Sequence, residues 1–203
     1  MDQIAYDDIV RSRIKLIKLS PFFGRIIFLL EPTEKKDIPT AATDGENLFY
    51  NPEFIKDLNP KNSKQGPNNL SKITGTLMHE VLHVALGHLW RRGDRNFHLW
   101  NMAADYVVNL IVREEAQKIG NSSERPDLPD GVLINEDYRD MTVEQIYDLL
   151  LKNAKFVPMA NCSMFHGDQE SQSGSGSGDD QQESDGSEGK DSDGKQGKDR
   201  KVS

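Results

Sequence analysis

Residues 77–90 read LMHEVLHVALGHLW, and this stretch decides the fold. It places His79, Glu80 and His83 in an apolar segment long enough for a buried helix. Buried leucine and valine stabilise a core helix, whereas buried imidazoles and a carboxylate cost free energy unless something compensates them. The stretch therefore predicts a core helix whose polar side chains meet a partner that offsets this cost.

The spacing of these polar residues is that of HExxH. Positions four apart on a helix differ by about 40° of rotation, so His79 and His83 leave the same face. Two neutral imidazoles on one face can bind a single zinc ion. Glu80 lies about 100° round from His79, beside the expected ligands, where a general base would take a proton from water that the metal activates. The motif thus predicts a catalytic site with one zinc per chain.

Two other interpretations of the motif are open. The histidines could be satisfied by neighbouring side chains alone, or they could belong to a structural zinc site. Structural sites usually fill all four positions, often with thiolates, and Cys162 is the only cysteine of the chain.

A catalytic zinc usually takes a third protein ligand. Asp105 is the first candidate, because its surroundings, NMAADYVVNLIV (101–112), are apolar and a carboxylate buried there needs a counter-charge. An ion pair of Asp105 with Arg91 or Arg92 is the alternative role for this carboxylate, and His98 is the alternative ligand. Both candidates stay open at this stage.

Other polar residues near the motif are assigned weaker roles. Asn101 and Asn109 lie one turn either side of Asp105 and can hydrogen-bond it or a neighbouring ligand. His88 lies about 180° from His79 on the same predicted helix, so it cannot join the same metal. It is assigned either to the end of the helix, where the helix dipole favours it, or to a contact behind one of the ligands.

Further elements follow from periodicity and turn residues. We expect helices over 3–19, from Asn51-Pro52, over about 70–90, over about 99–118, and over 141–153 with Thr142 as N-cap; strands are expected over 25–32, before the turn at Asp44-Gly45, and over 47–50. This order predicts an α+β domain with a small sheet to one side of the helices.

Composition divides the 203 residues into a domain, 1–162, and a disordered acidic tail, 163–203. Residues 167–201 contain no Val, Ile, Leu, Met or aromatic residue, so they cannot bury enough apolar surface to offset the entropy of ordering. From residue 167 onward there are ten acidic and five basic residues, which leaves −5 of the formal net charge of −8 in the tail. No basic face suited to nucleic acid is predicted.

The compartment is predicted from what the chain lacks. A single cysteine allows no intramolecular disulfide, and the acidic N-terminus MDQIAYDDIV is no signal peptide. The longest apolar run, IIFLL, is far too short to span a bilayer. We therefore expect a cytoplasmic protein without a membrane partner.

Four blocks in order carry a resemblance: TDGENLFYNPEF (43–54), HEVLHVALGHLWRR (79–92), LWNMAADYVVNLIV (99–112) and LPDGVLINEDYRDMTVEQIYDLL (128–150). Together with the opening VRSRIKLIKLSPFFGRI they resemble, over roughly residues 8–152, a metallopeptidase domain of bacteria and phages. That domain is often fused ahead of a von Willebrand factor A-like domain, whose DxSxS signature is absent here.

The resemblance implies a zincin-like fold and zinc-dependent peptidase activity on a protein or peptide. It also implies Asp105 as third ligand, and a substrate-holding edge strand ahead of the motif helix, at NLFYN (47–51). A von Willebrand factor A-like or ATPase protein would be its partner. Tyr50, Tyr106 and Tyr138 are candidates for polarising a substrate carbonyl, as tyrosines can near zinc.

Two rival functions remain. A zinc-binding scaffold could recognise a partner protein and cleave nothing, although a scaffold has no use for Glu80 beside the metal. A zinc amidase could instead act on cell-wall material, although no export signal is present.

Overall fold

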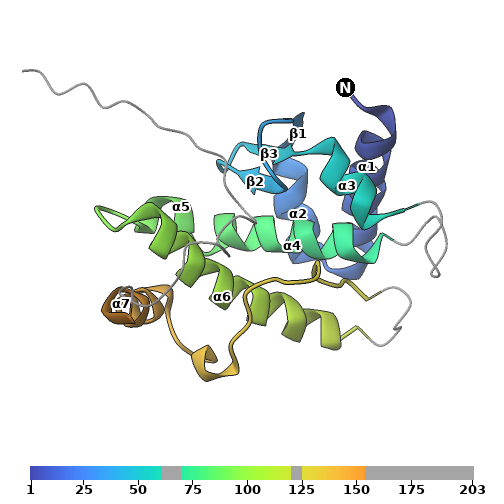
Figure 1. Cartoon of the computed structure of the whole chain (residues 1–203). Coiled ribbons are helices and arrows are strands. Elements are labelled where there is room, and N and C mark those ends of the chain that lie inside the picture. Colours follow the sequence, from blue (N-terminus) through green and yellow to red (C-terminus); the bar gives the residue numbers. More distant parts are fainter. Residues whose placement is uncertain (61–69, 120–124, 154–203) are drawn as a thin grey trace, which may run out of the picture. The chain divides into compact units, whose positions relative to one another are not determined.

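A small sheet lies to one side of the helices in the computed structural model, which describes residues 1–60, 70–119 and 125–153 (Figure 1). In chain order the elements are α1 (Gln3–Leu19), α2 (Pro21–Leu29), β1 (Glu31–Glu34), β2 (Ala41–Thr43), β3 (Asn47–Tyr50), α3 (Pro52–Leu58), α4 (Ser71–Ala85), α5 (His88–Arg91), α6 (Phe97–Gln117), the 3₁₀ turn η1 (Glu136–Tyr138) and α7 (Val143–Asn153). The prediction of an α+β domain with a small sheet is confirmed. The predicted tail, 163–203, and Cys162 lie outside the described residues.

The strand predicted over 25–32 was wrong. Helix α2 runs through this segment to Leu29, and β1 starts only at Glu31. Pro21 occupies the first turn of α2, where its missing N–H costs nothing. A Cβ at Gly24 would lie 2.6 Å from the Cα of Ile17, so this glycine lets α1 and α2 approach closely. The apolar run fits a strand or a buried helix equally well, and packing against α1 decides between them.

The sheet places β3 in its centre. β3 pairs in parallel with β1, with Glu31 opposite Asn47, and antiparallel with β2, with Ala42 opposite Phe49. The strand–turn–strand prediction around Asp44-Gly45 is confirmed. The expectation that residues 47–51 form an edge strand was wrong, because β1 covers the side of β3 away from β2.

The predicted helix starts are confirmed by their caps. The side chain of Asn51 accepts a hydrogen bond from the Glu53 N–H at 2.9 Å at the start of α3. Thr142 Oγ1 accepts from the Gln145 N–H at 3.3 Å, while the Thr142 N–H donates to Gln145 Oε1 at 2.8 Å. This reciprocal pair is a capping box, which satisfies two helix-end donors of α7.

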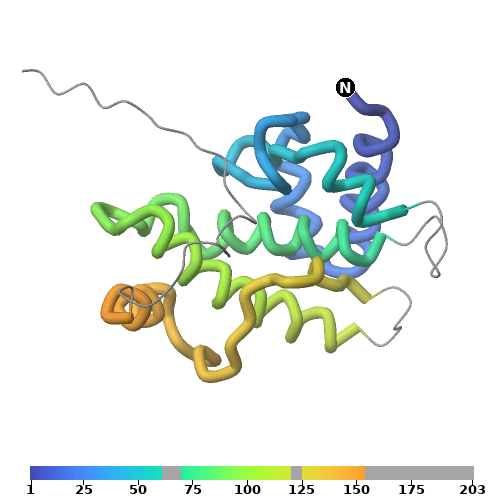
Figure 2. Tube along the Cα trace, viewed as in Figure 1, coloured from blue at the N-terminus to red at the C-terminus, as the bar shows by residue number. Residues whose placement is uncertain are grey.

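Helix α4 is the central element of the core. It contacts α1, α2 and β2 on one side and α6 on the other, as Figure 1 shows. The chain that follows α6 returns toward the first half of α4 (Figure 2), where the Asp127 N–H donates to the Ser71 carbonyl at 3.0 Å. A Cβ at Gly75 would lie only 1.9 Å from the Asp127 carbonyl oxygen, so glycine is required for this contact. Neighbours on every side thus fix the position of α4.

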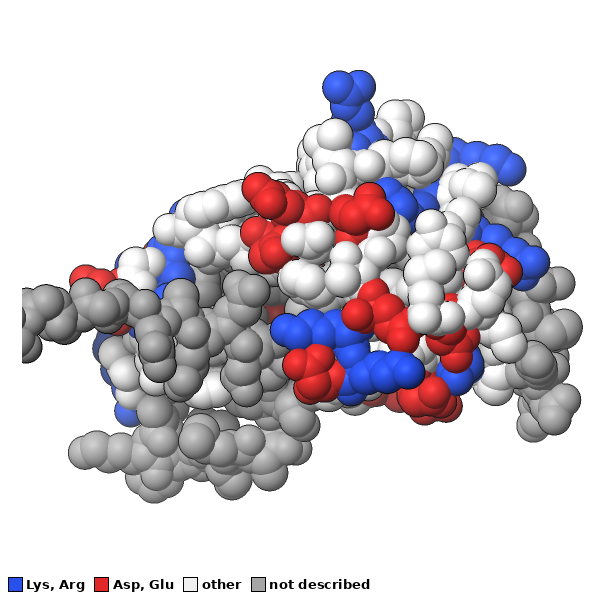
Figure 3. All heavy atoms as spheres, turned by 90° about the horizontal axis from the view of Figure 1, so that it is seen from above, with Lys and Arg blue, Asp and Glu red and all other residues white. Residues whose placement is uncertain are grey.

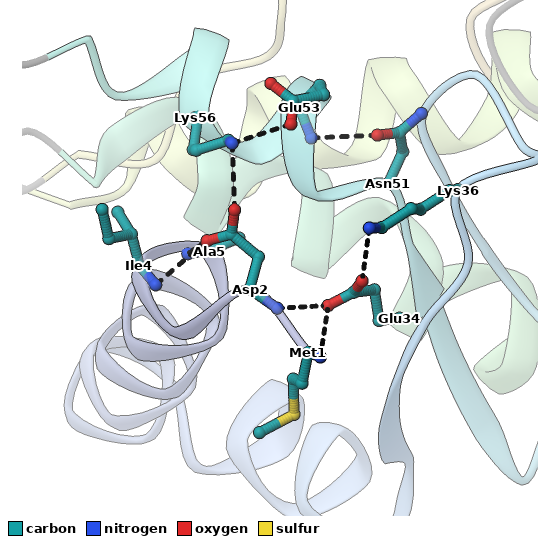
Figure 4. A network of polar contacts seen from close by, with 9 residues as sticks. All are labelled: Met1, Asp2, Ile4, Ala5, Glu34, Lys36, Asn51, Glu53 and Lys56. Atoms are coloured by element: carbon teal, nitrogen blue, oxygen red, sulfur yellow. Dashed lines mark hydrogen bonds and ion pairs between the residues drawn. The ribbon is translucent and has the colours of Figure 1, made fainter.

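A polar network anchors the N-terminus of α1 (Figure 4). Asp2 caps the helix by accepting from the Ile4 and Ala5 N–H groups, each at 3.1 Å, and it also pairs with Lys56 of α3 at 2.9 Å. The Asp2 N–H donates to Glu34 at the end of β1. The start of α1 is therefore linked by polar contacts to both β1 and α3. These contacts help to hold the sheet against the helices.

In the face shown in Figure 3, acidic and basic side chains are interspersed. This face therefore offers no field of one sign such as a nucleic-acid surface requires. Among the described residues, no helix has both the length and the apolar character to cross a membrane.

Candidate metal centre

Two facing helices bring three ligand-type side chains together. Helix α4 supplies His79 and His83, and α6 supplies Asp105. The Nε2 atoms of the two rings are 2.9 Å apart, and Asp105 Oδ1 lies 3.5 Å from the Nε2 of His79 and 3.2 Å from that of His83. All three side chains are buried. Residues 26 positions apart in sequence thus present three donor atoms to one point.

These atoms fit a zinc ion. With bonds of 2.0–2.1 Å, tetrahedral zinc holds its ligand atoms about 3.3 Å apart, and the three observed separations bracket that spacing. Among the described residues, the ion pairs of Asp105 are with these two rings. A buried carboxylate facing neutral imidazoles lacks a full counter-charge, which a divalent cation would supply.

Asn109 of α6 fixes the orientation of His79. Its amide nitrogen donates to the Leu133 carbonyl at 2.9 Å, so its Oδ1 accepts from His79 Nδ1 at 2.8 Å. His79 in its neutral form then carries its proton on Nδ1 and leaves Nε2 as a lone-pair donor, as a metal ligand requires. Asn101 reaches Asp105 at 3.5 Å, a longer contact. The prediction that these asparagines flank the site is thus supported by geometry.

Burial and charge act against each other in this cluster. Burial disfavours ionisation of Asp105, but hydrogen bonds from the two rings outweigh it and hold the pKa of this carboxyl below its usual value. Burial would lower the pKa of His79, but Asp105 outweighs it and raises that pKa. Burial dominates at His83 and lowers its pKa. Of the two rings, His79 is therefore the one whose surroundings favour a proton when no metal is bound.

Glu80 is a buried carboxyl, 2% exposed, whose Oε1 has no hydrogen-bond partner among the described residues. Burial raises its pKa to about 7, so the metal-free protein holds it close to half-ionised near neutral pH. A group that is costly to ionise and lacks a partner is poorly explained by packing alone. It is typical of a site that moves protons.

A cleft of about 320 Å³ opens beside this cluster. Its lining residues are Lys35, Ala42, Thr43, Asp44, Phe49, Glu80, His83, Leu89, Trp90, Phe97 and Asn101. Glu80 and His83 are thus reached from a cavity whose walls include aromatic side chains and strand β2. Such a cavity, with a few converging polar groups, is typical of a binding site for a substrate.

The open sheet edge at the cleft belongs to β2, although Phe49 of β3 also lines the cleft. The Thr40 carbonyl accepts from the Asn51 N–H at 2.7 Å, so Thr40 directs its backbone groups toward the β3 side of the sheet. Alternation along an antiparallel strand then points the N–H and C=O of Ala41 and Thr43 away from β3. The sheet edge beside α4 therefore belongs to residues 41–43.

His88 lies in a different place from the one predicted. Helix α4 ends at Ala85, not near Trp90, and Gly87 adopts a left-handed conformation with φ 67°. The chain then turns into α5, and the His88 ring is buried with its Nδ1 3.3 Å from His83 Nδ1. The prediction that His88 points away from the metal side was wrong because it assumed a continuous helix. Burial lowers the pKa of His88 to about 3, so the ring is neutral.

The three candidate tyrosines do not line the cleft. Alternation along β3 turns Phe49 to the cleft and buries Tyr50 in the core, where burial raises the pKa of its hydroxyl to about 12. Tyr106 and Tyr138 pack edge to face against each other, with ring centroids 4.9 Å apart, in the cluster of α6 and α7.

The structure also shows where the alternative ligand, His98, and the alternative ion-pair partners of Asp105, Arg91 and Arg92, lie. His98 is exposed and contacts Phe97 on the first turn of α6, outside the His–His–Asp group. Arg91 pairs with Glu144 at 2.7 Å, and Arg92 Nη1 reaches the Arg95 carbonyl at 3.5 Å. The geometry therefore favours Asp105 as the third ligand over His98, and favours metal ligation over an arginine pair.

The sequence interpretation left the role of His88 open, misplaced its ring, and missed the aromatic wall of Phe49, Trp90 and Phe97. Gly87 is the signal that would have placed the His88 ring, because a glycine just after an apolar helix often adopts the left-handed conformation that ends it. No local pattern indicates that Phe97 of α6 and Phe49 of β3 meet at one cleft.

Comparison with known proteins identifies a family and a relative. The model of a family described as "Putative metallopeptidase domain" matches residues 7–202. An uncharacterized protein of Thermotoga maritima is 25% identical over 113 residues, which cover 52% of this chain and 26% of that protein. The chain thus spans about a quarter of the length of this curated relative. No solved structure matches.

Proposed function

The chain belongs to the family described as a putative metallopeptidase domain, and on that premise we propose that it is a zinc-dependent peptidase with a zincin-like fold. His79, His83 and Asp105 would hold the metal. The substrate would be a protein or peptide that enters the cleft beside α4. A von Willebrand factor A-like or ATPase partner stays a prediction.

One observation carries this proposal beyond metal binding: Glu80 is buried beside the three ligand atoms, opens to the same cleft as His83, and has an oxygen without a partner among the described residues. A purely structural metal site needs no such carboxyl. A hydrolase needs a base next to the metal, with a pKa near the working pH, and burial provides that pKa here.

Zinc, when bound, supplies a Lewis acid that polarises the scissile carbonyl and makes nearby water a stronger acid. Glu80 takes the proton of the attacking water on its carboxylate and then gives it to the leaving amine. Asn109 keeps Nε2 of His79 unprotonated and aimed at the site.

Strand β2 is the element we assign to holding the substrate. The backbone groups of Ala41 and Thr43 point away from β3, and Ala42 and Thr43 line the cleft. An extended peptide can add to such an edge through main-chain hydrogen bonds, which bind it without regard to sequence. The substrate backbone would then lie along the sheet with its side chains toward the aromatic wall.

The test is cleavage of a complex peptide mixture by the zinc-loaded protein, with new N-termini read by mass spectrometry. Glu80→Gln should retain zinc and lose cleavage, because glutamine cannot accept the proton. Glu53→Gln, at an exposed carboxylate of α3, is the matched control and should cleave normally.

Three results would refute the proposal. Equal cleavage by Glu80→Gln and the wild type would exclude the assigned mechanism. Zinc binding without cleavage of any peptide would favour a scaffold that recognises a partner protein. Release of products from cell-wall material alone would favour an amidase.

A further inference from the structure

His88 is held in place by α6 although it belongs to α5. Its backbone carbonyl accepts a hydrogen bond from Trp100 Nε1 at 2.9 Å, and the two rings meet edge to face with centroids 6.5 Å apart. The left-handed Gly87 just before it makes the turn that returns the chain toward α4. A buried imidazole, 2% exposed, is thus brought against His83 by three separate features of the fold.

The two nitrogens of His83 face different partners. Its Nε2 points to His79 Nε2 and Asp105, while its Nδ1 lies 3.3 Å from the Nδ1 of His88. A ring nitrogen that binds a metal must be unprotonated, so a neutral His83 that binds through Nε2 carries its proton on Nδ1. That N–H then requires an acceptor, and the Nδ1 of His88 is the atom in position to accept.

We propose that His88 is a positioning residue, which accepts a hydrogen bond from His83 Nδ1–H and thereby fixes the ring and tautomer that present Nε2 to the metal. This inference rests on the proposed role of His83 as a ligand. His88 does for His83 what the amide oxygen of Asn109 does for His79. Each metal-binding ring would then have its own acceptor behind it.

The orphaned nitrogen of His88 agrees with this assignment. If Nδ1 accepts, the proton of the neutral His88 ring sits on Nε2, which is buried and without a hydrogen-bond partner among the described residues. An unsatisfied buried donor is a cost to stability. A side chain that lowers stability in this way is more readily explained by its effect on His83 than by packing.

Two variants of similar shape separate positioning from packing. His88→Asn keeps an acceptor near the place of Nδ1, whereas His88→Leu replaces it by a methyl group. Zinc affinity is measured for the full chain by competition with a chromophoric chelator. His88→Leu should bind zinc about 10–100-fold more weakly than the wild type, and His88→Asn should recover most of that loss.

Nitrogen-15 NMR of the zinc-loaded wild type should show His83 protonated at Nδ1 and His88 protonated at Nε2. Melting of the metal-free variants is the packing control. Without metal His83 can carry its proton on Nε2, between His79 and Asp105, so loss of the acceptor should matter little there.

Equal zinc affinity of His88→Leu and the wild type, equal weakening by both substitutions, or a His88 ring protonated at Nδ1 would each overturn the inference. Failure of the proposed function has a different signature. If zinc binds the wild type and His83→Ala equally, His83 is no ligand and both proposals fall. If zinc binds as proposed and no peptide is cleaved, only the peptidase assignment falls.

Discussion

Glu80→Gln should stabilise the metal-free protein, and by more as the pH rises. In the folded chain, burial raises the pKa of Glu80 from 4.5 to about 7. Between those values the folded state binds a proton that the unfolded state has lost, so the free energy of unfolding of the wild type falls as the pH rises. Glutamine resembles the protonated carboxyl but never ionises, so the variant escapes this loss.

The size of the effect follows from the two pKa values. One pH unit corresponds to about 1.36 kcal/mol, so the full difference amounts to about 3 kcal/mol above pH 7.5. At pH 5 the same calculation gives only about 1 kcal/mol, because this pH lies only about half a unit above the pKa of the unfolded carboxyl. For a domain of this size, 3 kcal/mol corresponds to roughly 5–10 °C in melting temperature.

Chelator-treated wild type and Glu80→Gln are unfolded by heat and by urea between pH 6 and pH 8.5, away from the pI near 5.1 where association is favoured. Glu53→Gln makes the same substitution at an exposed site, where the ion pair with Lys56 contributes little, and its difference from the wild type should stay small and constant across this range. A constant difference between Glu80→Gln and the wild type across this range, or one that shrinks as pH rises, would refute the reasoning. Added zinc should narrow the difference, because a nearby cation favours the ionised carboxyl.

Three further predictions concern the third ligand, the packing of α4 and the cleft. Asp105→Ala should weaken zinc binding by orders of magnitude while His98→Ala leaves it unchanged, as measured by zinc content after dialysis; the reverse result would move the third ligand to His98. Gly75→Ala should lower the free energy of unfolding by about 1–3 kcal/mol in urea titrations, because the new Cβ would lie 1.9 Å from the Asp127 carbonyl oxygen. An unchanged midpoint would show that the backbone at Asp127 can move away at little cost. Trp90→Ala, at an exposed residue that lines the cleft, should keep zinc affinity but lower kcat/KM for peptides with large apolar side chains by about tenfold. An equal loss of kcat/KM for all peptides would exclude a role of Trp90 in selecting apolar side chains.

The parts of the fold that could be predicted from the sequence depend on local geometry. The same-face arrangement of His79 and His83 follows from helical rotation alone. Turn chemistry at Asp44-Gly45 and the cap at Asn51 are likewise set within a few residues. These predictions succeed because the local sequence favours the same conformation as the complete fold, so no long-range contact is needed to decide between conformations.

The parts that failed depend on contacts between segments far apart in sequence. Whether β3 is an edge or a central strand is decided by its pairing with β1. Each residue of β1 lies 16 positions before its β3 partner in the chain, and the first two residues of β1 were expected at the end of another strand. The position of His88 depends on a left-handed Gly87 and on Trp100 of α6. Periodicity describes one element at a time and carries no information on such pairings.

The polar stripe of α6 explains why the buried histidines of α4 are tolerated. Asn101, Asp105 and Asn109 are four residues apart, so they lie along one face of a helix that is otherwise mostly apolar. This face meets α4, where Asn109 contacts His79 and Asp105 contacts both rings. Each helix alone would bury polar groups at a cost, and together they still leave a carboxylate facing two rings that share no full positive charge. In the metal-free protein Asp105 raises the pKa of His79, so a proton on this ring can offset part of that charge. A zinc ion would replace the proton and bind all three donors at once, which is the compensation that the sequence of α4 requires.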